Sequence, residues 1–179
     1  SRPFGGTNLT ELKLEQLKKA KNINQIILSS ESEEVLSIGR KLGVDLHIRD
    51  AYFSTPHIGM SEVYKYLAKN INADYILWVP VTNPFVDAKI YDDVINTFAS
   101  LNDGEYDCLL TVTEVRDYIF YNGKPVNFQP HPWQRSQDLD GACAINFAAC
   151  ILSRDNMIRW GSLVGNRPYF FYLDKAIGW

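Results

Sequence analysis

The chain has 179 residues, 46% of them hydrophobic, which is enough for one well-buried domain. A net charge of −3 argues against a general nucleic-acid-binding surface. No apolar run approaches the ~20 residues of a membrane span, and no charged-then-apolar stretch typical of a signal peptide opens the chain.

Short apolar stretches alternate with amphipathic ones through the first 113 residues. Asn8 is a candidate N-cap of the first helix, Ser30 with Glu33 forms a candidate capping box for the second, and Gly43 is a candidate stop for it. This βαβα alternation predicts an α/β fold with a mostly parallel sheet flanked by helices. Helices are predicted at 7–22, 33–43, 60–70 and 87–101, and strands at 25–30, 45–49, 74–81 and 107–113.

The alternation stops after Thr113. Asn122 and Gly123 lie between "DYIFY" and "KPVNF", which is a strong local signal for a β-hairpin. We therefore predict a single domain, 1–179, in which residues 114–137 form an inserted hairpin. Beyond it, a strand at about 143–152, a helix at 153–161 and a strand at 168–173 complete the domain.

No strand precedes the first predicted helix. The first strand of a doubly wound sheet is usually central, so its absence would leave unpaired backbone on both sides of a gap. Either the fold differs from this interpretation or residues upstream of Ser1 belong to the protein, and we favour the second.

Cysteine and histidine indicate neither disulfides nor a metal site. The three cysteines are odd in number and form no Cys-x-x-Cys pair, so we expect reduced, buried thiols in a cytoplasmic protein. The three histidines match no metal-ligand spacing.

Three stretches, taken in order, resemble the cytidylyltransferases that make CMP-activated keto-sugar acids, namely the CMP-sialic acid synthetases and their relatives for legionaminic, pseudaminic and Kdo-type sugars. The stretches are "IILSSESEEVLSIGRKLGVDLHIR", "PVTNPF" and "RSQDLDGACAINFAACIL". The resemblance implies a Rossmann-like nucleotide-diphospho-sugar transferase fold. It also implies a nucleotidyltransferase that transfers CMP from CTP to the anomeric hydroxyl of a sialic acid-like keto-sugar acid and releases pyrophosphate. Mg²⁺ is the implied cofactor, and the hairpin excursion is implied to build a homodimer.

The chain departs from the family pattern at several places. Two family elements are not in this sequence: the triphosphate loop, which lies before the first helix, and the Asp-x-Asp metal element, which follows a turn like "DKAIGW". We expect both in the working protein, so this sequence offers no candidate metal ligand or catalytic residue. Cys143 and Phe147 stand where the family has tyrosine and glycine, which leaves the sugar unidentified. The alternatives are a nucleotidyltransferase of this fold with another NTP or acceptor, and a catalytically inactive nucleotide-binding relative.

Four residues are candidates for nucleotide binding. Arg49 ends a strand, where α/β ligand sites form, although an ion pair with Asp45 or Asp50 is the alternative. Ser61 either donates to the nucleotide or is a helix N-cap, and Thr82 and Asn83, flanked by prolines, form either a pre-organised binding loop or a simple turn.

Six residues are candidates for sugar binding. A cation, an amide and a carboxylate fall within four positions and suit a polyhydroxylated acid; Asn146, alone in an apolar run, needs either a ligand or backbone partners. The alternative is a structural network between hairpin and core. The aromatic run near the end is predicted to be core with one ring lining the pocket. The six are Arg135, Gln137, Asp138, Asn146, Phe170 and Phe171.

Overall fold

The computed structural model describes residues 3–101, 104–139 and 141–178. It opens with a short antiparallel pair, β1 (Pro3–Phe4) and β2 (Thr7–Asn8), which the sequence did not predict. Helix α1 (Leu9–Lys19) follows directly, and the Asn8 side chain accepts a hydrogen bond from the Glu11 backbone N–H at 2.9 Å. The predicted cap is confirmed.

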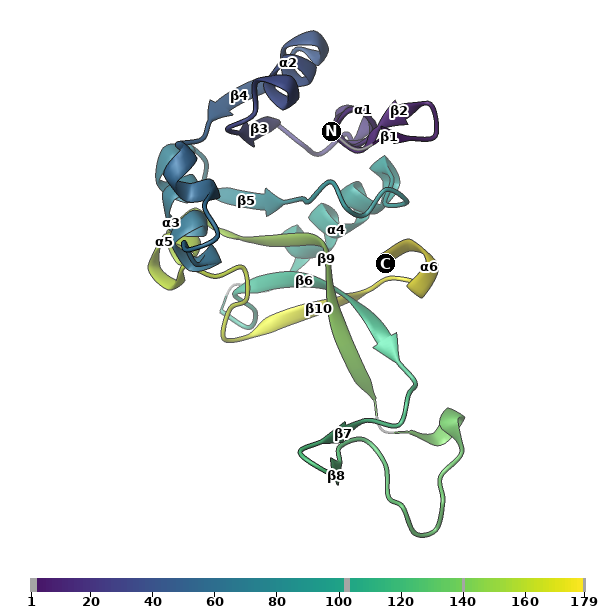
Figure 1. Ribbon diagram of the computed structural model, residues 1–179. Helices are drawn as coiled ribbons and strands as arrows, with labels where there is room; N and C mark the ends of the chain where they lie inside the picture. The colour runs from purple at the N-terminus through teal and green to yellow at the C-terminus, as the bar shows by residue number, and fades with distance from the viewer. Residues whose placement is uncertain (1–2, 102–103, 140, 179) are drawn as a thin grey trace.

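A four-stranded sheet in the order β10-β6-β9-β5 forms the centre of the molecule (Figure 1). Its strands are β5 (Tyr75–Trp78), β6 (Cys108–Val115), β9 (Ala142–Ser153) and β10 (Pro168–Tyr172). β10 pairs with β6 in parallel, whereas β9 is antiparallel to both β6 and β5. β9 runs backwards because the excursion leaves and re-enters the sheet at the carboxyl end of β6. The predicted α/β class is confirmed, with one strand reversed.

Strands β3 (Ile27–Ser30) and β4 (Asp45–Ile48) form a separate parallel pair, joined by α2 (Glu33–Leu42). Within the described ranges neither strand pairs with β5, so β3 and β4 are separate from the four-stranded sheet. Helix α2 lies close over its strands, since a Cβ on Gly39 would meet side-chain atoms of Leu46 at 2.6 Å and Leu28 at 2.8 Å.

One of the two caps predicted for α2 is wrong. Its N-cap is Ser32, whose hydroxyl accepts from the Val35 N–H, while the Ser30 hydroxyl accepts from the Ser32 N–H instead. The predicted stop is confirmed, because Gly43 adopts φ +67°, in the left-handed region that glycine tolerates.

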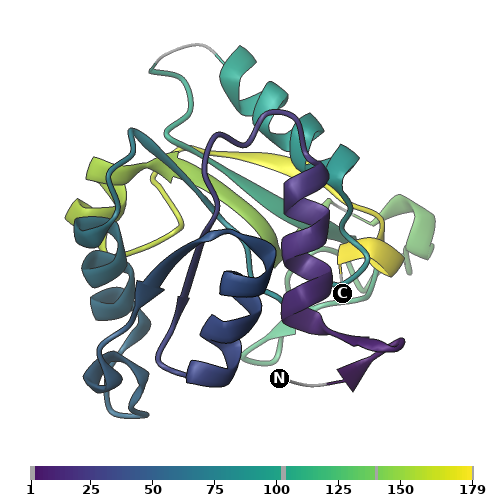
Figure 2. The ribbon, with the colours of Figure 1, turned by 90° about the horizontal axis from the view of Figure 1, so that it is seen from above.

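Helices cover both faces of the sheet (Figure 2). On one face α3 (Met60–Asn70) packs with α5 (Arg154–Trp160), over a core that includes Leu110 and Leu152. On the other, α4 (Ala88–Ser100) covers a second core that includes Leu109 and Ile151. Neighbouring residues of a strand thus face opposite cores, as strand alternation requires. No helix in the described ranges has both the length and the apolar character needed to cross a membrane.

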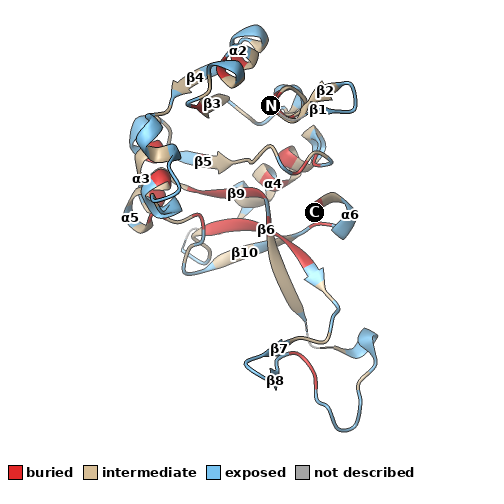
Figure 3. Cartoon of the chain, viewed as in Figure 1, coloured by how far each residue is buried: buried red, intermediate tan, exposed pale blue. Residues whose placement is uncertain are grey.

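The excursion between β6 and β9 reaches away from the sheet (Figure 1) and is mostly exposed (Figure 3). It contains β7 (Phe120–Tyr121), β8 (Lys124–Pro125) and a 3₁₀ turn, η2 (Ser136–Asp138). Asn122 at φ +50° and Gly123 at φ +74° join β7 to β8, so the predicted Asn-Gly hairpin is confirmed. The chain then continues through β9 and β10 to a short final helix, α6 (Lys175–Gly178).

Candidate functional site

A pocket of about 500 Å³ opens at the carboxyl ends of the parallel strands β6 and β10. Such strand ends are where ligands bind in open α/β sheets, and the volume suits a small-molecule ligand. The pocket is lined by Thr113, Glu114, Arg116, Asp117, Tyr172, Leu173, Asp174 and Lys175.

The lining carries charges of both signs. Arg116 Nε donates to Glu114 at 2.8 Å in an exposed ion pair, and Asp174 accepts from the Ala176 N–H at 2.8 Å, where α6 begins. Lys175 adds a second cation at the rim. Among the described residues there is no group of three or more acidic, histidine or cysteine side chains that fits a metal ion; Asp140 lies outside these residues.

A buried hydrogen-bond network lies directly behind this pocket. Asn83 Nδ2 donates to the Gly178 carbonyl at 2.8 Å and lies 3.5 Å from the Asn146 carbonyl oxygen, and Asn146 Nδ2 donates to Thr113 Oγ1 at 2.9 Å. A Cβ on Gly178 would lie 2.4 Å from Asn146 Nδ2. The network therefore joins the loop after β5, the middle of β9, the end of β6 and α6.

Strand β9 bulges at this network. Its register against β6 shifts between Leu110 and Val112, and Thr111 Oγ1 bonds both the N–H (2.9 Å) and the carbonyl (3.0 Å) of Ala149. Phe147 sits in the bulge at φ +55° with 42% of its surface exposed. A non-glycine residue in this conformation is strained. The backbone of Phe147 therefore has a geometry that favours glycine, at the position where the family that the sequence resembles has glycine.

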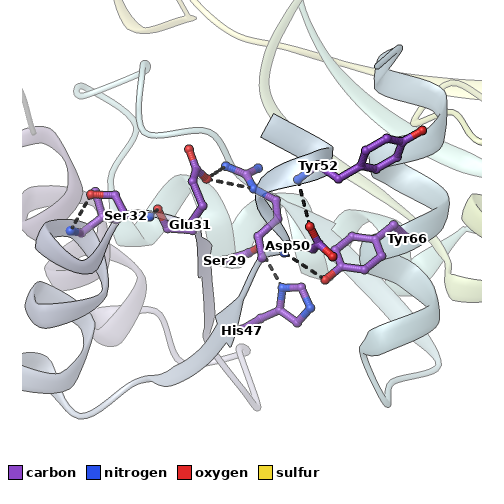
Figure 4. A network of polar contacts seen from close by, with 10 residues as sticks. Ser29, Glu31, Ser32, His47, Asp50, Tyr52 and Tyr66 are labelled. Carbon is purple, nitrogen blue, oxygen red and sulfur yellow. Dashed lines mark hydrogen bonds and ion pairs between the residues drawn. The ribbon is translucent and has the colours of Figure 1, made fainter. Parts of the chain in front are cut away.

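A second polar cluster lies at the ends of β3 and β4 (Figure 4). Arg49 Nε donates to Glu31 Oε2 at 3.1 Å, and this bond is the main cause that lowers the pKa of Glu31. Ser29 Oγ lies 3.0 Å from His47 Nδ1. Burial, together with the nearby Arg49, lowers the pKa of His47 and so favours the neutral imidazole. Arg49 is thus held by Glu31, neither by Asp45 nor by Asp50.

The other predicted nucleotide-binding residues differ in exposure. Ser61 is exposed at the second position of α3, and because Gly59 is the N-cap, the cap interpretation is wrong. Thr82 is exposed, whereas Asn83 is 6% exposed and faces inward to the buried network. Of this pair, only Thr82 presents its side chain to solvent.

The structure does not join Arg135, Gln137 and Asp138 to Asn146 within one chain. All three lie exposed in or beside η2, and Arg135 Nε donates locally to Asp138 at 2.7 Å. They lie apart because the excursion carries η2 away from the sheet (Figure 1). Asn146 is 8% exposed, and its side chain bonds to Thr113 and to the Ala148 N–H. This agrees with the alternative of a structural network, although the network links strands and loops of the domain rather than the hairpin.

The aromatic run splits between core and surface. Phe171 packs into the core under α4, and Phe170 is 41% exposed on the other face of β10. The ring that lines the pocket is Tyr172, not Phe170 or Phe171. Glu114, Arg116 and Asp117 were not among the predicted site residues, although a position at the carboxyl end of a strand is the same signal that identified Arg49.

A sequence model of the cytidylyltransferase family matches residues 2–127. The 3-deoxy-manno-octulosonate cytidylyltransferase of Rickettsia typhi is 28% identical over 112 residues, which cover 63% of this chain and 45% of the relative. That of Rickettsia felis is 27% identical over 112 residues, or 63% of this chain and 44% of the relative. The matched stretch thus spans less than half the length of these relatives.

Solved structures share the fold at low identity. A CMP:2-keto-3-deoxy-manno-octonic acid synthetase complexed with CTP has a TM-score of 0.68 at 8% identity and covers 97% of this chain and 82% of its own. A 4-diphosphocytidyl-2C-methyl-D-erythritol synthase from Anaerococcus prevotii has a TM-score of 0.66 at 13% identity, covering 96% and 78%. The predicted Rossmann-like nucleotidyltransferase fold is confirmed.

Proposed function

This chain belongs to the cytidylyltransferase family, and we propose that it transfers CMP from CTP to the anomeric hydroxyl of a keto-sugar acid. In the reaction, the hydroxyl oxygen forms a bond to the α-phosphorus and loses its proton, while the bond from that phosphorus to the bridging oxygen breaks and pyrophosphate leaves. The observation that carries the proposal is the family match over residues 2–127.

The pocket at the ends of β6 and β10 supports a sugar acid as acceptor. Arg116 and Lys175 line it beside Glu114 and Asp117, so it offers cations for a carboxylate and acceptors for hydroxyls. The Rickettsia relatives carry 3-deoxy-manno-octulosonate in their names, which makes that sugar acid the first acceptor to test and sialic acid the second.

On the nucleotide side, we propose Arg49, Ser61 and Thr82 as direct contacts and Asn83 as the anchor of the loop that carries Thr82. Glu31 holds the Arg49 guanidinium in place, which suits it to recognise a ring or ribose as a fixed, multi-donor group. Mg²⁺ is the proposed cofactor, and among the described residues no group of three or more acidic, histidine or cysteine side chains fits a metal ion.

We expect the protein to prefer cytidine nucleotides. CMP or CTP at about 100 times its Kd stabilises the fold by about 2.7 kcal/mol, while UTP and ATP at equal concentration give much smaller shifts in a thermal melt. Equal shifts for all four nucleotides would contradict the proposal. Product analysis with the octulosonate, sialic acid and a methylerythritol phosphate as acceptors then separates the acceptor classes; the last arm is included because of the fold match to a 4-diphosphocytidyl-2C-methyl-D-erythritol synthase.

We also propose a homodimer built on the excursion. Its exposed apolar side chains, Phe120 (61%), Tyr121 (71%), Val126 (58%) and Trp133 (65%), form more apolar surface than an isolated hairpin usually leaves open. A symmetric pair of such excursions covers it.

The dimer is expected by light scattering at tens of micromolar protein. Tyr121→Glu should convert it to monomer, because two buried carboxylates would face the apolar contact. Met60→Glu is the matched control, since Met60 is 52% exposed outside the excursion and should leave the mass unchanged. A monomeric wild type, or a dimeric Tyr121→Glu variant, contradicts the proposal.

A further inference from the structure

Helix α1 holds the loop after β5 through a buried lysine. Lys13 is 2% exposed, and its Nζ donates to the carbonyls of Asn83 at 2.8 Å and Val86 at 3.2 Å and to Tyr91 Oη at 2.7 Å. An ammonium group has three N–H donors and no acceptor, so these partners match its full capacity. One turn along the helix, Gln16 Nε2 donates to the Pro84 carbonyl at 2.8 Å, so α1 binds three carbonyls of this loop.

Burying a lysine side chain to make this contact is energetically unfavourable. No carboxylate forms an ion pair with Lys13 among the described residues, and burial, only partly opposed by Asp87, lowers its pKa to about 8. An apolar residue of similar length would fill the same space without the cost of burying a charge. The lysine therefore serves the loop carbonyls rather than the packing of α1.

The loop that Lys13 holds contains two of the proposed nucleotide-binding residues. The Asn83 carbonyl accepts a hydrogen bond from Lys13, and the Asn83 side chain donates to the Gly178 carbonyl, so the loop is fixed from both sides. Thr82 precedes this anchor and is exposed. We propose that Lys13 is a positioning residue, which holds the Asn83–Val86 backbone so that Thr82 is presented in its nucleotide-binding position. This inference rests on the proposed function.

The variants that test it are Lys13→Met, Tyr91→Phe and Lys18→Met, with CMP affinity measured by calorimetry at pH 7. Lys13→Met keeps the length and removes all three donors, and we expect CMP affinity to fall about tenfold or more. Tyr91→Phe removes one acceptor of Lys13 but leaves both loop carbonyls bonded to it. Lys18→Met removes an exposed hydrogen bond from the same helix to the Leu42 carbonyl. Both variants should bind CMP within about twofold of wild type. A purely structural Lys13 would lower stability in Lys13→Met and Tyr91→Phe without moving CMP affinity in either, and that result overturns the inference.

A second measurement uses the wild type alone, in case Lys13→Met does not fold. Coupling between two sites is reciprocal, so if the Lys13 bonds favour CMP binding, bound CMP must hold Lys13 in place. Acetylation by a small acylating reagent, read residue by residue by mass spectrometry, should slow about tenfold at Lys13 with saturating CMP and stay unchanged at the exposed Lys18. An unchanged rate at Lys13 overturns the inference. Wild-type protein that binds no CMP instead removes the proposed function, so the two failures are distinguishable.

Discussion

Replacing Gly178 with alanine is expected to disrupt the network behind the pocket and, with it, acceptor turnover. The new methyl carbon would lie 2.4 Å from Asn146 Nδ2 and 2.9 Å from Thr113 Oγ1. Both atoms belong to buried side chains bonded to each other, so neither yields without breaking that bond. Overpacking of this kind costs about 1–3 kcal/mol, roughly 2–4 °C of melting temperature per kcal/mol for a chain of this size.

Function should fall further than stability, because α6 also receives the Asn83 side chain and carries Lys175 at the pocket rim. We expect kcat/KM for the acceptor to drop about tenfold or more at a temperature where the variant is folded. Gly141→Ala is the matched control, since a Cβ there meets nothing within 4 Å. If Gly178→Ala melts and turns over like Gly141→Ala, the network does not support the site.

The sequence predicted the local features of the fold well and its long-range pairing less well. Asn8 and Gly43 form the expected caps because capping depends on a few neighbouring residues. Ser30 was a plausible cap by spacing, but it ends β3, and Ser32 is the residue at the start of the helix. The antiparallel direction of β9 was not predicted, because direction depends on where the excursion returns, which no local pattern encodes.

The candidate site shows the same division. Strand ends identified Arg49 and the loop of Thr82 and Asn83, but not which side chain of that loop faces inward. Residue type grouped Arg135 with Asn146 in one predicted sugar site. Arg135 instead caps η2 in the excursion and Asn146 lies in the middle of β9, so the two are not joined within one chain. On β10, alternation divides the rings between two faces, yet the sequence does not state which face borders the pocket; the register with β6 puts Tyr172 there.

The core beneath the site sets the largest stability effect. Leu110 is fully buried in the middle of β6, one residue from the Thr111 side chain that spans the β9 bulge, and packs in the cluster with Leu152 and Met157. We expect Leu110→Ala to destabilise the fold by about 3–5 kcal/mol, because the close-packed sheet and helices cannot collapse fully into the space left. That is a large part of the 5–15 kcal/mol typical of a domain.

Chemical denaturation of Leu110→Ala measures this loss, with Leu110→Met as the matched control. Methionine conserves the volume and should cost less than about 1.5 kcal/mol, so the difference between the two variants isolates the cavity. CMP should still stabilise the folded fraction of Leu110→Ala, since Leu110 faces the α3–α5 core and not the pocket. A loss below about 1 kcal/mol for Leu110→Ala would mean that the sheet repacks freely at this position, and β6 would then not be the rigid support on which the pocket, the bulge and the Asn146 network depend.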